Sequence, residues 1–152
     1  MARHCTVNYC PVCAAPLEQR QVYGQLRPAC PQCHFVHYTD PKVAAVVLVE
    51  HENRVLLVRR AWNPSRGQWT LPGGFVDADE DPRAAAAREC LEEGGVPVEI
   101  TGLVGLFYGR EHRDGADIVI AYTGRVLSDE AHPGDDADAA RFFGLGEWPE
   151  LA

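Results

Sequence analysis

Three glutamates in the second half of the chain are spaced so that they could bind a metal ion. Glu89, Glu92 and Glu93 occupy positions i, i+3 and i+4, so on a helix their side chains would share one face. Three carboxylates this close repel one another. Hard divalent cations such as Mg²⁺ or Mn²⁺ relieve that repulsion because they prefer oxygen ligands. An isolated ExxEE pattern is equally compatible with a solvated acidic helix face, so the surrounding sequence has to decide.

Four cysteines near the N-terminus form a second group with metal-binding spacing. Cys10 and Cys13 make one CxxC pair, and Cys30 and Cys33 make another. Together they would complete a tetrahedral four-sulfur shell, which suits zinc best, with iron or an Fe–S cluster as the chemical alternative. Such a shell is closed, so we predict a structural zinc that stabilises a segment too short to fold alone. Docking to a partner or to nucleic acid is the alternative role.

The sequence around the glutamates matches a known box. From Gly74 to Val96 the chain follows Gly-x5-Glu-x7-Arg-Glu-U-x-Glu-Glu-x-Gly-U, where U is a bulky apolar residue. Cys90 is the least typical U, and we expect it to be a small core residue. This stretch resembles the Nudix hydrolase superfamily, and the resemblance extends from about Pro41 to the C-terminus. It implies an α/β fold, a Nudix α/β/α sandwich around a mixed sheet, here preceded by the small zinc ribbon.

The resemblance also implies a catalytic site that uses Mg²⁺ or Mn²⁺. The cation would be held by the helix carboxylates and one backbone carbonyl, contributed by Glu89, Glu92, Glu93 and Gly73. One of these glutamates could be the base that activates water. Glu80 would pair with Arg88 and brace the preceding loop against the helix. In the related pattern an acid shortly before the terminal Arg-Phe strand adds a base or a metal ligand, and Asp136 is our candidate.

The residues before the box indicate a substrate class. The segment from Arg59 to Gly74, taken with the ribbon, looks like the ribbon-bearing Nudix hydrolases similar to FAD and ADP-ribose pyrophosphatases. That resemblance implies hydrolysis of a nucleoside diphosphate-X compound to AMP and X-phosphate. The candidate contacts for phosphates and base are Arg59, Arg60, Arg66, Trp62, Trp69 and Tyr108. We expect core packing for Phe107. The alternatives are an NADH pyrophosphatase, a hydrolase that sanitises nucleoside triphosphates, and a non-catalytic nucleotide-binding sensor.

These side chains need elements that hold them in place. A cap and a proline at 81–82 predict a helix that ends at the glycine pair 94–95. Apolar and alternating runs predict strands over 43–49, 54–58, 69–71, 99–108, 117–126 and 141–144. A hairpin turn is expected at 52–53, and a second helix is expected to open at 147–150.

Composition limits the remaining possibilities. The chain has 152 residues and a formal net charge of −8 at pH 7, which disfavours general binding to a phosphate backbone. It lacks an apolar run long enough to cross a bilayer and the apolar core of a signal peptide, so we expect no membrane partner and a cytoplasmic location. A change in composition predicts a small ribbon over 1–38 and a second unit over 39–152, which the resemblance implies is a Nudix hydrolase domain. The family resemblance allows a homodimer, and the polar segment 109–115 is expected to act as a lid.

Overall fold

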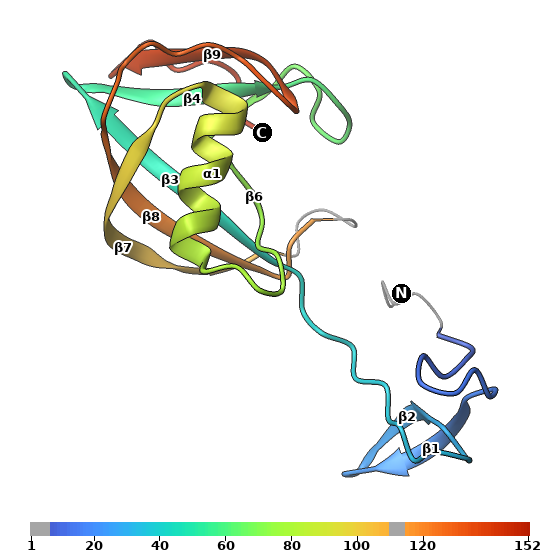
Figure 1. Ribbon diagram of the computed structural model, residues 1–152. Helices are drawn as coiled ribbons and strands as arrows, with labels where there is room; N and C mark the ends of the chain where they lie inside the picture. The colour runs from blue at the N-terminus through green and yellow to red at the C-terminus, as the bar shows by residue number, and fades with distance from the viewer. Residues whose placement is uncertain (1–6, 110–114) are drawn as a thin grey trace. The chain divides into compact units, whose positions relative to one another are not determined.

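The chain folds into two compact units, Met1–Asp40 and Pro41–Ala152 (Figure 1). The computed structural model describes residues 7–109 and 115–152. In these ranges no helix combines the length and the apolar character that crossing a membrane requires.

The first unit is a short hairpin with two cysteine-bearing turns. Strands β1 (Glu18–Val22) and β2 (Gln25–Ala29) pair antiparallel, and Tyr23-Gly24 form the turn with positive φ angles of 49° and 77°. Its buried cluster contains three side chains, Cys10, Ala15 and Cys30, with Leu17 and Phe35 partly buried against it. Because two of the three are cysteines, the unit has almost no apolar core of its own.

The second unit is a mixed sheet with one helix among the described residues. Its elements are β3 (Val43–His51), β4 (Arg54–Arg60), β5 (Trp69–Thr70), β6 (Gly73–Phe75), α1 (Pro82–Gly94), β7 (Val98–Tyr108), β8 (Ile118–Val126) and β9 (Ala137–Gly144). The strand order is β5-β4-β3-β8-β7, with β6 also paired to β3 and β9 to β4. The β3–β8 pair is parallel and the other pairs are antiparallel. This mixed sheet and its helix confirm the expected α/β class.

Helix α1 packs its alanine-rich face against the sheet. In Figure 1 it lies against β3, between β7 on one side and β4 and β9 on the other. Ala85, Ala86 and Cys90 are fully buried there and share the core with Val47 and Leu56. The burial of Cys90 confirms that it is a core residue. Small residues on this face let the helix approach the strands closely, and of its three clustered glutamates only Glu92 is exposed.

Local signals in the sequence correctly predicted both ends of helix α1 and the turn of the β3–β4 hairpin. Asp81 caps α1 by accepting a hydrogen bond from the Arg83 amide at 2.8 Å. Gly95 ends the helix in the left-handed conformation, at φ 69°. The β3–β4 turn has positive φ at both central residues, Glu52 and Asn53, as a two-residue hairpin requires.

Two expectations about elements were wrong. The segment after β9 contains no helix: the Trp69 amide donates to the Glu150 carbonyl, and the Ala152 amide donates to the Trp69 carbonyl, so this segment is extended. Pairing with β5 replaces the local helix signal there. No strand was predicted at β6, because two glycines disfavour a strand. Strand β6 forms through pairing with Ala44–Val46, where an added Cβ on Gly73 would lie 2.5 Å from the Ala45 carbonyl oxygen.

Candidate active site

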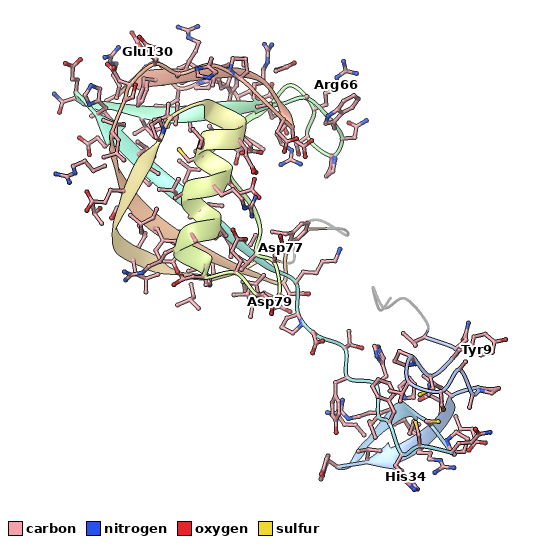
Figure 2. The ribbon with its side chains drawn as sticks, viewed as in Figure 1. Tyr9, His34, Arg66, Asp77, Asp79 and Glu130 are labelled. Atoms are coloured by element: carbon pink, nitrogen blue, oxygen red, sulfur yellow. The ribbon has the colours of Figure 1, made fainter. Side chains whose placement is uncertain are left out.

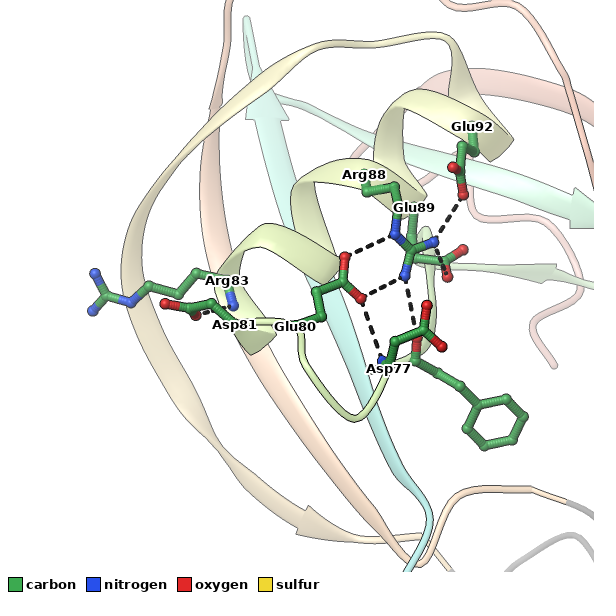
Figure 3. Close-up of polar contacts among 8 residues, drawn as sticks. Asp77, Glu80, Asp81, Arg83, Arg88, Glu89 and Glu92 are labelled. Atoms are coloured by element: carbon green, nitrogen blue, oxygen red, sulfur yellow. Dashed lines mark hydrogen bonds and ion pairs between the residues drawn. The ribbon is translucent and has the colours of Figure 1, made fainter.

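Arg88 is the centre of a carboxylate network on the exposed side of α1 (Figure 3). Its Nε and Nη2 donate to the two carboxylate oxygens of Glu80 at 2.8 and 2.9 Å. Its Nη1 donates to Glu89 at 2.8 Å and to Glu92 at 2.9 Å. The hydrogen bonds from Arg88 hold the pKa of Glu80 below its ordinary value. The pKa of Arg88 is raised in turn, chiefly by its hydrogen bonds to Glu80 and also by those to Glu89 and Glu92. The Glu80–Arg88 pair that the family resemblance implies is therefore present.

The same guanidinium ties α1 to the strand in front of it. Nη2 of Arg88 also donates to the carbonyl oxygen of Phe75, the last residue of β6, at 3.2 Å. The amide of Asp77 donates to Glu80 at 3.4 Å. Arg88 therefore connects the strand, the loop and the helix that together carry the sequence box.

Glu93 points towards the strand and away from Arg88. It accepts a hydrogen bond from the Gly73 amide at 3.0 Å. The pKa of Glu93 is raised to about 7, chiefly by burial and also by the charges of Glu89 and Asp136, against the lowering effect of the Gly73 amide and of Arg60. Burial also raises the pKa of Glu89. Two neighbouring, partly buried carboxylates with raised pKa values mark this end of the helix as a candidate functional site.

The glycine pair of β6 makes room for this arrangement. An added Cβ on Gly74 would lie 2.5 Å from Cδ of Glu89, so only a residue without a side chain lets that carboxylate rest on the strand. The sequence contained this signal, as the glycine pair in front of the box, but it gave no indication that the pair forms a strand. The contact that Gly73 makes with the site is through its amide, whereas the family resemblance implied a role for its carbonyl oxygen.

The donor set on α1 fits a hard divalent cation in chemistry. Glu89, Glu92 and Glu93 offer carboxylate oxygens, which Mg²⁺ and Mn²⁺ prefer. Glu89 and Glu93 lie against β6 and Glu92 is exposed, and the three side chains do not converge on one point, since Glu89 and Glu92 turn to Arg88 and Glu93 turns to Gly73. Within the described ranges, only the four cysteines bring three or more ligand atoms close enough to share one ion.

Among the proposed substrate contacts, Arg59 and Trp69 are held by neighbours. Arg59 donates to Asp138 at 2.6 Å, and its guanidinium carbon lies 5.7 Å from the Trp69 ring centre. Trp69 packs edge-on against Phe143, with the ring centres 4.8 Å apart. Both side chains are half-buried, and these contacts within the protein are enough to explain their positions.

Of the other candidates, Arg60 is half-buried, while Trp62, Arg66 and Tyr108 are exposed. Nε of Arg60 donates to the Pro64 carbonyl at 3.0 Å, and its charge acts on Glu93. Trp62 is 65% exposed, and Figure 2 shows Arg66 on the same loop between β4 and β5. Tyr108 is exposed at the end of β7. Phe107 is also exposed, so the expectation that it packs in the core was wrong; among the described strands β7 pairs with β8 alone.

Two further expectations concern the predicted catalytic acid Asp136 and the expected lid over 109–115. Asp136 is exposed, and its charge is one of those that raise the pKa of Glu93. Residues 110–114 of the expected lid lie outside the described residues.

The four cysteines form a compact sulfur cluster in the first unit (Figure 2). The Cys10–Cys33 and Cys13–Cys30 Sγ pairs are each 3.5 Å apart, and all four sulfurs lie within 4.8 Å of one another. A tetrahedral zinc–thiolate shell needs sulfurs about 3.8 Å apart. Backbone amides of Cys33 and Gln32 point at the sulfur of Cys30 and lower its pKa to about 6. The site therefore fits zinc in both spacing and chemistry.

Comparisons with known proteins agree with this geometry. A model of the NUDIX domain matches residues 39–152. An ADP-ribose pyrophosphatase from Methanocaldococcus jannaschii is 39% identical over 117 residues, 76% of this chain and 69% of that protein. The crystal structure of a NUDIX hydrolase from Nitrosomonas europaea is similar with a TM-score of 0.84 and 36% identity, over 94% of this chain and 81% of that one. A bifunctional NMN adenylyltransferase/ADP ribose pyrophosphatase from Francisella tularensis, complexed with AMP and Mn ion, aligns with a TM-score of 0.57 and 26% identity, over 72% of this chain and 35% of that one.

Proposed function

The chain belongs to the Nudix family, and from this premise we propose that it cleaves the diphosphate bond of a nucleoside diphosphate-X compound with the help of Mg²⁺ or Mn²⁺. The observation that carries the proposal is the arrangement on α1, where Glu89 and Glu93 lie against the glycine strand β6 while Glu89 and Glu92 share Arg88. A manganese ion accompanies AMP in the similar Francisella protein, which supports the choice of metal.

The roles of the individual residues follow from their contacts. Glu89, Glu92 and Glu93 would hold the cation, and one of them or Asp136 would accept the proton of the attacking water. A divalent cation bound there would neutralise phosphate oxygens and lower the pKa of a bound water. Arg88 would hold the helix and the preceding strand together through Glu80 and the Phe75 carbonyl while substrate binds.

ADP-ribose and FAD are the substrates that we propose first. The archaeal relative named an ADP-ribose pyrophosphatase supports this class. Arg66 and Trp62 are exposed, and the charge of half-buried Arg60 acts on Glu93, so we propose that these three bind the phosphates and the base. NADH and nucleoside triphosphates are the competing substrates.

Three proposals concern the rest of the protein. The sulfur cluster would bind zinc, which would hold the first unit together. A homodimer is supported by the exposed apolar side chains of β7, an edge strand of the described sheet: Leu103, Val104, Leu106, Phe107 and Tyr108. The cytoplasmic location stays a prediction from the sequence.

A product-resolved screen tests the function. The protein would be incubated with ADP-ribose, FAD, NADH and oxidised nucleoside triphosphates in Mg²⁺ or Mn²⁺, and AMP release would be measured. We expect AMP from an ADP-X compound, and we expect Glu92→Gln and Glu93→Gln to remove at least about 99% of turnover. Glu50→Gln, on an exposed side chain of β3, is the matched control and should retain activity. Tight ADP-ribose binding without AMP release would favour the sensor, and full activity in both variants would refute the metal site.

A further inference from the structure

The connection between β8 and β9 is fastened to the C-terminal end of α1. We call residues 130–136 of this connection the clasp. The amide of His132 donates to the Gly94 carbonyl at 3.0 Å, and the amide of Gly134 donates to the Glu93 carbonyl at 3.2 Å. Carbonyls in the last turn of a helix have no partner within that helix, so the clasp satisfies two of them.

Two of the contacts between the clasp and the end of α1 are too close for a side chain to fit between them. A Cβ added to Gly134 would lie 2.5 Å from the carbonyl oxygen of Glu92. A Cβ added to Gly95 would lie 2.5 Å from the ring of His132. The backbone of the clasp therefore lies directly against the turn that carries Glu92 and Glu93.

The other end of the clasp is fastened to the sheet. The amide of Ala61, just after β4, donates to the Asp136 carbonyl at 2.9 Å, and the Ala137 amide donates to the Gly134 carbonyl at 3.0 Å. Asp135 has a left-handed backbone, with φ 46°. Besides burial, which is the largest cause, the charge of Asp135 raises the pKa of Glu89 and that of Asp136 raises the pKa of Glu93. Asp135 and Asp136 directly follow Gly134, whose amide is bonded to the Glu93 carbonyl, so both acids are attached to the last turn of α1.

We propose that Gly134 is a positioning residue for the hydrolysis: its close contact with α1 sets where Asp135 and Asp136 lie relative to Glu89 and Glu93. The inference rests on the proposed function. Gly134 itself would not touch the substrate. Any larger residue would push the clasp off the last turn of α1 and move both acids together, since they follow Gly134 directly in the chain.

The test is Gly134→Ala, with Gly144→Ala as the matched control. At Gly144 an added Cβ would come no closer than 3.4 Å to another atom, so that variant should match the wild type. For Gly134→Ala we expect kcat to fall about 10- to 100-fold while KM changes less than about threefold, because a displacement near 1 Å costs rate more than binding. Circular dichroism and the melting temperature would show that the protein remains folded at the assay temperature.

A double-mutant cycle separates positioning from general damage. The background is the double variant Asp135→Asn, Asp136→Asn. If Gly134 acts through these acids, Gly134→Ala should lower kcat less than about twofold further in that background. An equal loss in both backgrounds, or kcat within about twofold of the wild type for Gly134→Ala, would overturn the inference.

A second variant keeps the test decisive if Gly134→Ala does not fold. His132→Ala removes the ring that rests on Gly95 and introduces no clash, and we expect a smaller loss of kcat with the same dependence on the two aspartates. Unchanged kcat in this variant would then overturn the inference. A folded wild-type protein that hydrolyses no compound in the screen would instead refute the proposed function itself.

Discussion

Glu93 is partly buried at the end of α1 with one hydrogen-bond donor, the Gly73 amide, facing it. Burial raises its pKa to about 7, against an ordinary value of 4.5, because a desolvated carboxylate is costly to charge. The folded protein therefore holds this proton more tightly than the unfolded chain does. It follows that ionised Glu93 destabilises the fold at high pH, and this cost disappears as pH falls below the ordinary value.

We therefore expect Glu93→Gln to stabilise the protein while it removes activity. In buffer without Mg²⁺ or Mn²⁺ at about pH 8, its free energy of unfolding should exceed that of the wild type by roughly 1–2 kcal/mol, allowing for partial exposure. The difference should shrink as pH falls through 7 and vanish near 4.5. Denaturant unfolding over this pH range measures it, with Glu50→Gln as the exposed control. A variant that is less stable than the wild type at high pH would contradict this account.

At the scale of elements, β6 and α1 form one structural unit of the site. Strand β6 pairs with β3 and presents Gly73 and Gly74 to the helix, where they contact Glu93 and Glu89. Arg88 closes the arrangement by binding the Phe75 carbonyl. The positions of the carboxylates therefore depend on the absence of side chains on a three-residue strand as much as on the helix.

Gly74→Ala tests this dependence. Its Cβ would overlap the carboxylate of Glu89, so we expect Mn²⁺ affinity to fall at least about tenfold as this ligand is displaced. The affinity can be followed by the electron paramagnetic resonance signal of free Mn²⁺. Gly105→Ala, on β7, is the control, because an added Cβ there would come no closer than 3.5 Å to other atoms. Wild-type affinity in Gly74→Ala would show that β6 does not position Glu89.

The whole molecule contains two units with very different cores. The second buries a cluster of aliphatic side chains from strands and helix, while the buried residues described in the first are two cysteines and two alanines, Cys10, Ala15, Ala29 and Cys30. A unit of about 40 residues with so small a core usually needs a metal or disulfides. We therefore expect the first unit to depend on zinc for its fold, and the second to fold by apolar burial.

Removal of zinc should unfold one unit and spare the other. A chelator that prefers zinc to magnesium should abolish hydrogen-exchange protection of the β1–β2 amides and leave protection in β3 and β8 unchanged. Hydrolysis in excess Mg²⁺ should stay within about twofold of the untreated protein, since the four sulfurs form a closed shell. Full protection of β1 and β2 after chelation would contradict a structural role for the metal. Loss of hydrolysis would instead show that the ribbon contributes to the reaction.

Features set by residues near one another in the chain could be predicted from the sequence. They include the caps of α1, the β3–β4 turn, the two cysteine pairs, the shared face of the glutamates and the Nudix family itself. Backbone preference and helical periodicity fix such features over a few residues, so no distant partner is needed.

Only the tertiary structure decided the contacts between distant segments. Strand β6 exists because it pairs with β3, and the segment around Glu150 is extended because it pairs with Trp69. The contact between Glu93 and the Gly73 amide and the contacts between the clasp and α1 likewise join residues at least 20 positions apart. Which carboxylate binds Arg88 depends on side-chain direction, which sequence spacing alone does not give. Local propensity does not encode such pairings, since their free energy comes from burial and hydrogen bonds that form only when the chain has folded.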